Sequence, residues 1–329
     1  MLPIKRNVLV TSLVLGVAYG LVAYFAFERH ASLPTVAFLA LVPLAIGAIP
    51  LLISDLDQIR SYVFILFVPW ITILAVFAVL AAVLREGVLC LLVLGAPFYL
   101  SAMLGTLIAT IIRAIMIRRE KRKAAAAALM LLPFLLAGVE QRYLVREAQV
   151  TVGSSTVIDA PAALVFDRLA EVPTMRDDEY QPGLFNKLGV PRPIRATVDR
   201  KAEGGHRTGE FTRGLTFQET ITTYDAPRRM TFDIAVDPRA LLPGSTERHA
   251  LEGGYFRFVD ATYTLDPVGD GRVKLTLSSR YVARSSVNAY GKLWADAILG
   301  DFQDRVLAVI KRRCETRPAE APTEVAATR

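Results

Sequence analysis

The stretch STVIDAPAALVFDRLAEV, Ser155 to Val172, has the pattern of a short strand, an Ala-Pro turn and an amphipathic helix. Pro161 suits the first position of a helix, where a missing N–H costs nothing. Apolar side chains then recur on one face of the expected helix: Leu164, Val165, Phe166 and Leu169. This is the pattern of a soluble domain, yet the chain before about Val139 is largely apolar.

The composition separates the chain into two regions. Mean hydropathy is +0.39, which is high for a soluble protein, because apolar residues are concentrated in the first 140 positions. The net charge is +7, and the run RREKRK at Arg118 to Lys123 supplies much of it between two apolar segments. Basic clusters beside apolar segments orient membrane helices, so we do not expect a nucleic-acid partner.

Cysteine and histidine are too few and too scattered for a metal or redox site. Cys90 lies in an apolar run and Cys314 near the C-terminus, so we expect no disulfide between them. The three histidines pair with no cysteine or carboxylate cluster at ligand spacing. We therefore expect neither a metal nor a cofactor.

Five apolar segments predict transmembrane helices. The first, which follows a basic lead, lacks a clear cleavage site and is expected to be an uncleaved helix. The fifth has 16 residues, short of the roughly 20 that a span takes. No ionisable residue interrupts the four longer segments, which favours an anchor over a transport pathway. The expected spans are 7–27, 35–53, 62–84, 88–112 and 124–139.

Loop charges predict the orientation of these helices. Lys5 and Arg6 precede the first span and six basic residues lie within 113–123, so both regions are expected in the cytoplasm of a cell (plasma or inner) membrane protein. If 124–139 crosses the bilayer, the following domain lies on the outer face. If that segment lies in the interface, the domain is cytoplasmic. Its lack of charge and of a polar face favours the crossing.

From about Gln149, period-two alternation predicts a run of strands separated by Gly, Pro and Asp. A long amphipathic helix follows, on which one apolar stripe recurs every four residues: Tyr290, Trp294, Ile298, Phe302, Val306 and Ile310. A curved antiparallel sheet closed over by one long helix is an α+β layout, and it leaves a cavity where an apolar ligand can bind. The expected strands after the first are 194–200, 206–213, 215–224, 229–236, 255–267 and 272–282.

This order of elements resembles the START-like superfamily, also called SRPBCC, the polyketide cyclase/dehydrase and lipid-transport group, over about 150–314. Four stretches are similar to a branch of bacterial membrane-anchored proteins with this domain: LGVPRPIRA, GEFTRGLTFQETIT, APRRMTFDI and LWADAILGDFQDRVLAVIKRR. The resemblance implies a helix-grip fold with an internal hydrophobic cavity. It implies no particular chemistry, because binding modules and enzymes share this fold.

Glu219 is the most informative single position. In LTFQETITTY, alternation places Phe217, Glu219 and Ile221 on one face, and the apolar members of that set should face the helix. Glu219 is therefore predicted to point into the cavity, where burial would raise its pKa and allow it to orient a ligand or act as acid or base. The alternatives are a bulge that shifts the register, or a structural ion pair with an arginine.

Aromatic residues supply further candidates. Tyr290 and Trp294, with Ile298 on the same stripe, could line the cavity mouth, and Tyr263 and Tyr281 could donate hydrogen bonds to a ligand. Core packing is the competing interpretation for each aromatic residue.

The predicted architecture is an all-α transmembrane bundle over 1–140, a START-like α+β domain over 141–314 and a disordered tail over 315–329. The leading hypothesis is membrane-tethered binding or transfer of a hydrophobic, lipid-like small molecule, with the bilayer as the second partner. The alternatives are a cyclase- or hydrolase-like enzyme that uses Glu219, and a regulatory or scaffolding role with a filled cavity. Sequence alone leaves the ligand and the oligomeric state open.

Overall fold

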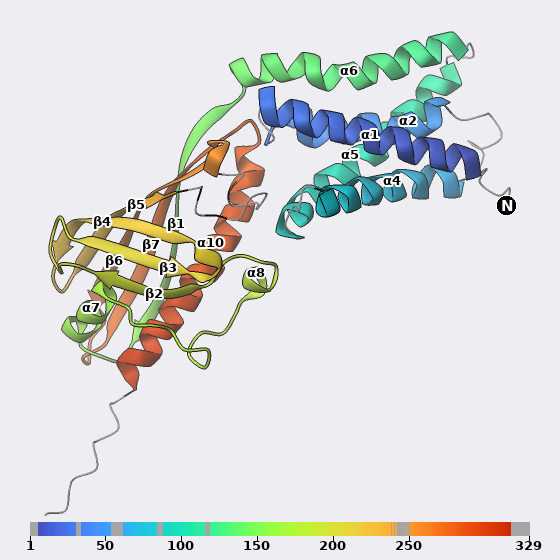
Figure 1. Ribbon diagram of the computed structural model, residues 1–329. Helices are drawn as coiled ribbons and strands as arrows, with labels where there is room; N and C mark the ends of the chain where they lie inside the picture. Colours follow the sequence, from blue (N-terminus) through green and yellow to red (C-terminus); the bar gives the residue numbers. More distant parts are fainter. Residues whose placement is uncertain are drawn as a thin grey trace, which may run out of the picture.

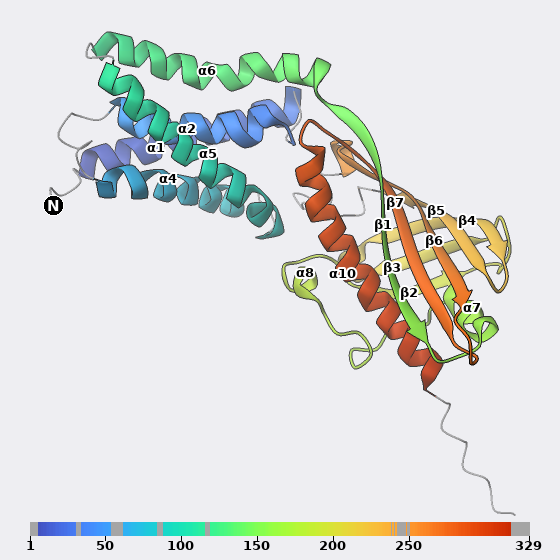
Figure 2. The same ribbon diagram turned by 180° about the vertical axis from the view of Figure 1, so that it is seen from behind.

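The computed structural model describes residues 6–30, 34–53, 62–83, 88–115, 119–237 and 251–316, together with positions 239, 241 and 248. Within these residues an apolar helical bundle is followed by an antiparallel sheet and a long C-terminal helix (Figures 1 and 2). Of the predicted tail, only Glu315 and Thr316 are described, and the prediction of disorder falls outside the described residues. The same holds for Lys5 of the predicted topology signal.

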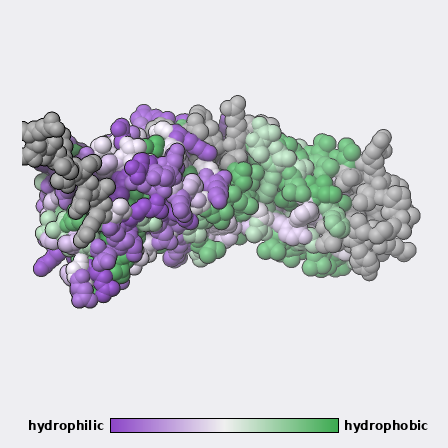
Figure 3. Space-filling model, turned by 90° about the horizontal axis from the view of Figure 1, so that it is seen from below, coloured by the Kyte–Doolittle hydropathy of each residue, from purple (hydrophilic) through white to green (hydrophobic). Residues whose placement is uncertain are grey.

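The bundle places its helices side by side, and Figure 3 shows that hydrophobic residues dominate its visible face while the sheet domain is mostly hydrophilic. The π-helical turn η1 continues directly into α2. The described elements are α1 (Arg6–His30), η1 (Ala37–Leu41), α2 (Val42–Ile53), α4 (Tyr62–Val83), α5 (Val88–Ile115) and α6 (Arg119–Tyr143).

Three helical stretches are long and apolar enough to cross a membrane: Val10–Arg29, Val88–Ile115 and Lys121–Tyr143. The third contains the predicted span 124–139, and it is longer than predicted because helix-forming Lys, Arg, Glu and Gln extend it at both ends. The regions of the second and third predicted spans hold shorter apolar helices, Ala37–Leu52 and Phe67–Ala82.

Helices α2 and α5 cross with their backbones in contact. A Cβ atom added at Gly105 would lie 1.9 Å from the carbonyl oxygen of Leu44, and one added at Gly47 would lie 2.0 Å from that of Ala102. The Thr106 hydroxyl donates a hydrogen bond to the Gly47 carbonyl at 3.0 Å. Both glycines are therefore required for this approach, which is the role that small residues have where helices cross closely in membrane proteins.

The soluble domain is a seven-stranded antiparallel sheet in the order β1-β7-β6-β5-β4-β3-β2, so β1 and β2 are its free edges. The predicted strands are all present, with shifts of a few residues at their ends, and β1 starts earlier than predicted because it follows α6 almost directly. Their bounds are β1 (Arg146–Ile158), β2 (Pro193–Val198), β3 (His206–Phe211), β4 (Thr216–Asp225), β5 (Arg229–Val236), β6 (Phe256–Pro267) and β7 (Val273–Ser285).

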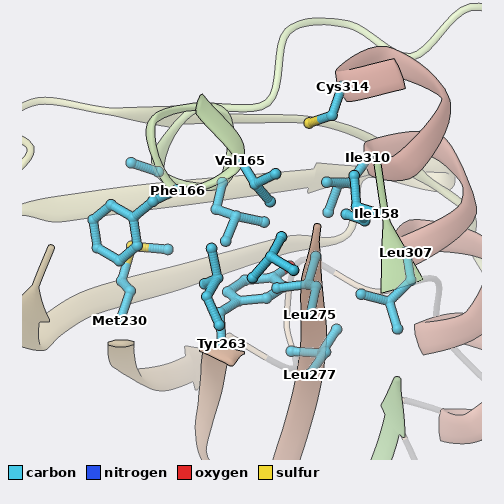
Figure 4. Packing of buried hydrophobic residues seen from close by; sticks show 14 of the residues in the cluster. Ile158, Val165, Phe166, Met230, Tyr263, Leu275, Leu277, Leu307, Ile310 and Cys314 are labelled. Carbon is cyan, nitrogen blue, oxygen red and sulfur yellow. The ribbon is translucent and has the colours of Figure 1, made fainter. Parts of the chain in front are cut away.

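Helix α10 (Asn288–Glu315) packs along one face of this sheet, and α7 (Ala162–Ala170) covers the end farther from the bundle. The short helix α8 (Leu184–Lys187) lies in the long connection between α7 and β2. The main core fills the space between α7, α10 and the sheet, where Phe166, Met230 and Leu275 are almost completely buried (Figure 4). This is the predicted helix-grip arrangement.

Glu140, near the end of α6, joins the bundle to the sheet domain. Its carboxylate accepts hydrogen bonds from the backbone N–H groups of Val36 and Ala37 at 2.6 and 2.7 Å. It also accepts a hydrogen bond from the Ser286 hydroxyl, which lies between β7 and α10. Only 4% of the residue is exposed, so these donors replace the water that the charge has lost.

The start of α10 makes a second set of contacts with the bundle. The Ser285 hydroxyl donates to the Pro34 carbonyl at 2.6 Å, and Val287 packs against the main apolar cluster of the bundle. The Tyr290 hydroxyl donates to the Val93 carbonyl of α5 at 2.5 Å. These contacts fix where the sheet domain meets α5.

Replacement of Gly105 by Ala should lower the midpoint of thermal unfolding of the full chain in detergent. The new methyl group meets a backbone oxygen, which cannot rotate away, so the helices must separate, at a cost of about 1–3 kcal/mol. The matched control is Gly95→Ala in the same helix, where a Cβ meets nothing within 4 Å. Equal midpoints for the two variants would contradict the close crossing of α2 and α5.

Candidate functional site

A pocket of about 330 Å³ lies between the sheet and α10. Its walls are mainly apolar and come from β2 to β7, from α10 and from the segments around Val172 and Val190. One wall residue, Leu89, belongs to α5 of the bundle. The other apolar lining residues include Met175, Phe211, Leu215, Phe217, Phe232, Ile234, Leu241, Leu251, Phe256, Phe258, Ala295, Ile298, Leu299, Phe302 and Val306.

The strand register places aromatic residues at the end of the pocket nearer the bundle. Phe256 pairs with Ala283 close to the end of β7, where the chain adjoins the bundle. Phe258 contacts both Phe256 and Phe217, with ring centroids 4.8 and 5.1 Å apart. Tyr263 lies seven residues further along β6, about 23 Å from Phe256 at 3.3 Å per residue. The pocket therefore runs along the sheet away from the bundle.

A buried ion pair lies beyond these aromatic residues. Arg207 on β3 and Glu219 on β4 are directly paired across the two strands, and their side chains form a salt bridge. The side chains are only 6% and 5% exposed. Arg207 also donates to the Ala170 carbonyl at 3.1 Å, and its guanidinium lies 5.0 Å from the centre of the Phe232 ring. The pair is thus held in place from several sides.

Burial raises the pKa of Glu219, and the Arg207 guanidinium opposes that rise. Burial is the largest single influence on the pKa of Arg207 and lowers it, but the charge and hydrogen bond of Glu219 together with the nearby Tyr263 raise it by more, so the guanidinium stays charged. We take the pair as ionised while the contact is intact, because a neutral Glu219 would leave the Arg207 charge buried without a partner.

Four further polar side chains line the pocket: Tyr263, Ser279 and the partly exposed ion pair of Arg195 and Glu210. Within the described residues the Tyr263 hydroxyl has no hydrogen-bond partner, although the residue is 4% exposed. Burial raises the pKa of Tyr263, so its hydroxyl stays protonated and can donate to a ligand. Ser279 accepts a hydrogen bond from Gln303 Nε2 at 3.0 Å, which ties α10 to β7.

Four of the residues proposed from the sequence line the pocket: Phe217, Glu219, Tyr263 and Ile298. The alternation in β4 placed Glu219 on the inward face, as its burial shows. The arginine partner expected under the alternative interpretation of Glu219, a structural ion pair, is also present. Glu219 thus both lines the pocket and forms a structural ion pair.

The other four residues proposed from the sequence do not line the pocket. Ile221 is buried in the main core, because this end of β4 faces α7 and the core rather than the void. Tyr281 is fully buried, stacks on Phe256 and donates to Asp296 at 3.2 Å. Tyr290 contacts α5, and Trp294, one turn further along α10, is not among the pocket residues. The stripe on α10 thus faces the bundle at its start, the pocket in its middle and the core at its end.

Arg207 and Leu89 were missed by sequence reasoning. Alternation in HRTGEF places Arg207 on the same face of the strand as Phe211. This pattern indicates that Arg207 is buried. Its position opposite Glu219 depends on the β3–β4 register, which no local pattern reveals. Leu89 sits in an apolar span and has no distinguishing feature in the sequence. The described residues contain no group of three or more potential metal ligands among His, Cys, Asp and Glu.

The wall formed by Val172 and Met175 is fastened to the end of α10. Arg313 contacts Glu179 through two nitrogens at 2.7 and 3.2 Å, and it donates to the Pro173 and Thr174 carbonyls at 3.0 Å. The hydrogen bond from Arg313 lowers the pKa of Glu179 to about 2. This ion pair and its neighbouring hydrogen bonds hold the segment of Val172 and Met175 against α10.

The chain belongs to the polyketide cyclase / dehydrase and lipid transport family, whose sequence profile matches residues 149–315. This family assignment agrees with the fold and with an apolar pocket between sheet and helix. The matched region begins in β1 and ends with α10, so it contains most of β1 and all of β2 to β7.

Solved structures that resemble part of the chain include the Zhui aromatase/cyclase from Streptomyces sp. R1128, with 14% identity and a TM-score of 0.35 over 51% of this chain and 94% of that chain. Norcoclaurine synthase from Thalictrum flavum has 14% identity and a TM-score of 0.33 over 53% and 98%. Protein Ms6760 from Mycobacterium smegmatis has 16% identity and a TM-score of 0.33 over 51% and 93%. At such values no individual structure indicates a shared activity. No curated protein matches the chain.

Replacement of Glu219 by Gln should destabilise the full chain by about 3–5 kcal/mol, because it leaves the Arg207 charge buried without its counter-ion. The double variant Arg207→Met with Glu219→Leu should recover most of the lost stability. The matched control is Glu210→Gln, which breaks the more exposed Arg195–Glu210 pair between β2 and β3 and should lower the midpoint far less, because exposed ion pairs contribute little to stability. Thermal unfolding in detergent distinguishes these outcomes, and a double variant no more stable than Glu219→Gln would contradict the prediction.

Replacement of Glu179 by Gln should cost on the order of 1–2 kcal/mol at neutral pH, the range for a hydrogen bond to a charged group. The pKa of Glu179 in the folded chain is about 2, below its ordinary 4.5. Its contribution is therefore complete above about pH 4.5 and is lost as the pH falls towards 2. Thermal midpoints of the variant and the parent chain should converge across this interval. Asp304→Asn, at an exposed position on α10, is the control and should shift the midpoint little at any pH.

Proposed function

We propose that residues 1–140 anchor the chain in a membrane and that residues 141–314 bind or transfer a hydrophobic, lipid-like small molecule in the pocket beneath α10. The observation that carries this proposal is a continuous, mainly apolar pocket of about 330 Å³ that shares a wall residue, Leu89, with the apolar bundle. The family match to a lipid-transport group supports the same class of ligand.

The attachment to the bundle has a physical consequence for such a ligand. A site held beside the bilayer meets membrane-dissolved molecules at a high effective concentration. It also spares the ligand a passage through water, where each exposed CH₂ group costs about 0.8 kcal/mol. Tethering to the membrane therefore favours the binding of a hydrophobic ligand more than that of a water-soluble one.

We retain the orientation favoured by the loop charges, with the N-terminus in the cytoplasm and the binding domain on the outer face of the membrane. The 23-residue apolar stretch Lys121–Tyr143 supports it, since this stretch is long enough to span. A reporter that is active on one side only, fused to the C-terminus, tests the orientation.

Native mass spectrometry of the full chain, purified in mild detergent from its host, tests the binding. We expect a co-purifying apolar molecule. Ile298→Trp should remove it, because the larger side chain fills the pocket. The matched control is Leu293→Trp, which changes a residue of the same helix that is 65% exposed, and it should leave the bound molecule in place. A pocket empty in every preparation would refute the proposal.

An enzymatic role for Glu219 is the second candidate, since this carboxyl group lines the pocket and burial raises its pKa. The contact with Arg207 argues against it, because a general acid would first have to leave that ion pair. The two functions predict different bound molecules in Glu219→Gln. An enzyme should accumulate its unreacted substrate, with a changed mass, whereas a binding protein should hold the same molecule as the parent chain.

A further inference from the structure

The end of the pocket nearer the bundle is built jointly by both regions of the chain. Leu89 lies in the first turn of α5, and Tyr290 at the start of α10 is hydrogen-bonded to Val93, one turn further along α5. Ala295 and Ile298, which line the pocket, follow within about two turns of Tyr290. This end therefore abuts an apolar helix.

The position of α5 against this end is fixed by polar contacts. The buried Glu140 carboxylate holds the start of η1 and the turn between β7 and α10 together, and Ser285 is bonded to Pro34. Because these bonds cross between the two regions, they hold Leu89 beside α10. The position of Leu89 does not depend on the linker between the regions alone.

The chemistry of the pocket changes along its length. Aromatic side chains dominate near the bundle, and Arg207, Glu219 and Tyr263 lie farther along β3, β4 and β6. The ion pair has no net charge, and the Tyr263 hydroxyl faces the pocket unpaired among the described residues. A small polar head group that accepts a hydrogen bond, such as an alcohol or a carbonyl, fits this inner end better than a phosphate.

We propose that the pocket takes up a single-chain amphiphile with a small uncharged head group directly from the bilayer, head first, past Leu89. This inference rests on the proposed function and specifies its ligand class and its route. A volume of about 330 Å³ lies at the lower end of the range for ligand pockets and suits one chain better than two. The tail then lies among the aromatic residues, towards the membrane helices.

Photolabelling of the full chain in phosphatidylcholine vesicles tests both the route and the direction. One hexadecanol probe carries a diazirine next to the hydroxyl group, and a second carries it at the far end of the chain. We expect the first probe to label peptides around Glu219 and Tyr263, and the second to label peptides around Leu89 and Phe256. The reverse pattern would overturn the head-first direction.

Substitutions test the route. Leu89→Trp should reduce labelling by about tenfold, the factor expected from an overpacked contact. Leu92→Trp, at an exposed position of the same helix, should not change it. The competing route passes the partly exposed pair Arg195–Glu210 at the β2–β3 edge. A loss of labelling in Arg195→Trp, with none in Leu89→Trp, would overturn the proposed route.

The outcomes also separate this inference from the function on which it rests. If native mass spectrometry detects an apolar ligand but Leu89→Trp leaves the labelling unchanged, the proposed route is wrong and the binding function stands. If no probe labels any pocket peptide and no molecule co-purifies, both proposals fail. A bound phospholipid with two chains would overturn the ligand class while leaving the binding function intact.

Discussion

One helix has to cover one face of a seven-stranded sheet, and most features of the domain follow from this constraint. Seven strands about 4.8 Å apart span about 29 Å, whereas a helix with its side chains is about 10–12 Å across. Helix α10 can fill only part of that width. Near α7 the remaining space is filled, and the core there is closely packed. Nearer the bundle this closely packed core ends, and the sheet, α10, Leu89 of α5 and the segments around Val172 and Val190 enclose the pocket.

An ion pair inside such a pocket carries a desolvation penalty, so its presence there points to a role other than stability. Two well-packed apolar side chains at Arg207 and Glu219 would fold at least as well in most proteins. The pair is instead directly opposed across two strands and held further by Ala170 and Phe232. Together with Tyr263 it provides polar surface within a mainly apolar pocket, of the kind that can orient a ligand.

The fold was predictable from sequence because each element carries its own local signal. Period-two alternation located the strands, and the stripe from Tyr290 to Ile310 located α10. The candidate site was only half predictable, since its composition depends on which elements meet. Alternation within β4 gave the inward direction of Glu219, but the β3–β4 register decides that Arg207 is its neighbour. The helical stripe likewise could not show that its residues face three different environments.

The contribution of the bundle to the pocket depends on contacts between residues far apart in the sequence. One of these residues is Glu140, which no sequence pattern singled out. Glu140 ends an apolar helix, where a charged residue is expected to face water. In the fold it is buried and accepts hydrogen bonds from two segments more than a hundred residues away on either side. Without that carboxylate, the N–H groups at the start of η1 and the Ser286 hydroxyl would lose a shared acceptor. The contact between Leu89 and the pocket thus depends on a polar junction between the two regions, and the proposed route past Leu89 has hydrogen bonds at its side that keep the two regions in place.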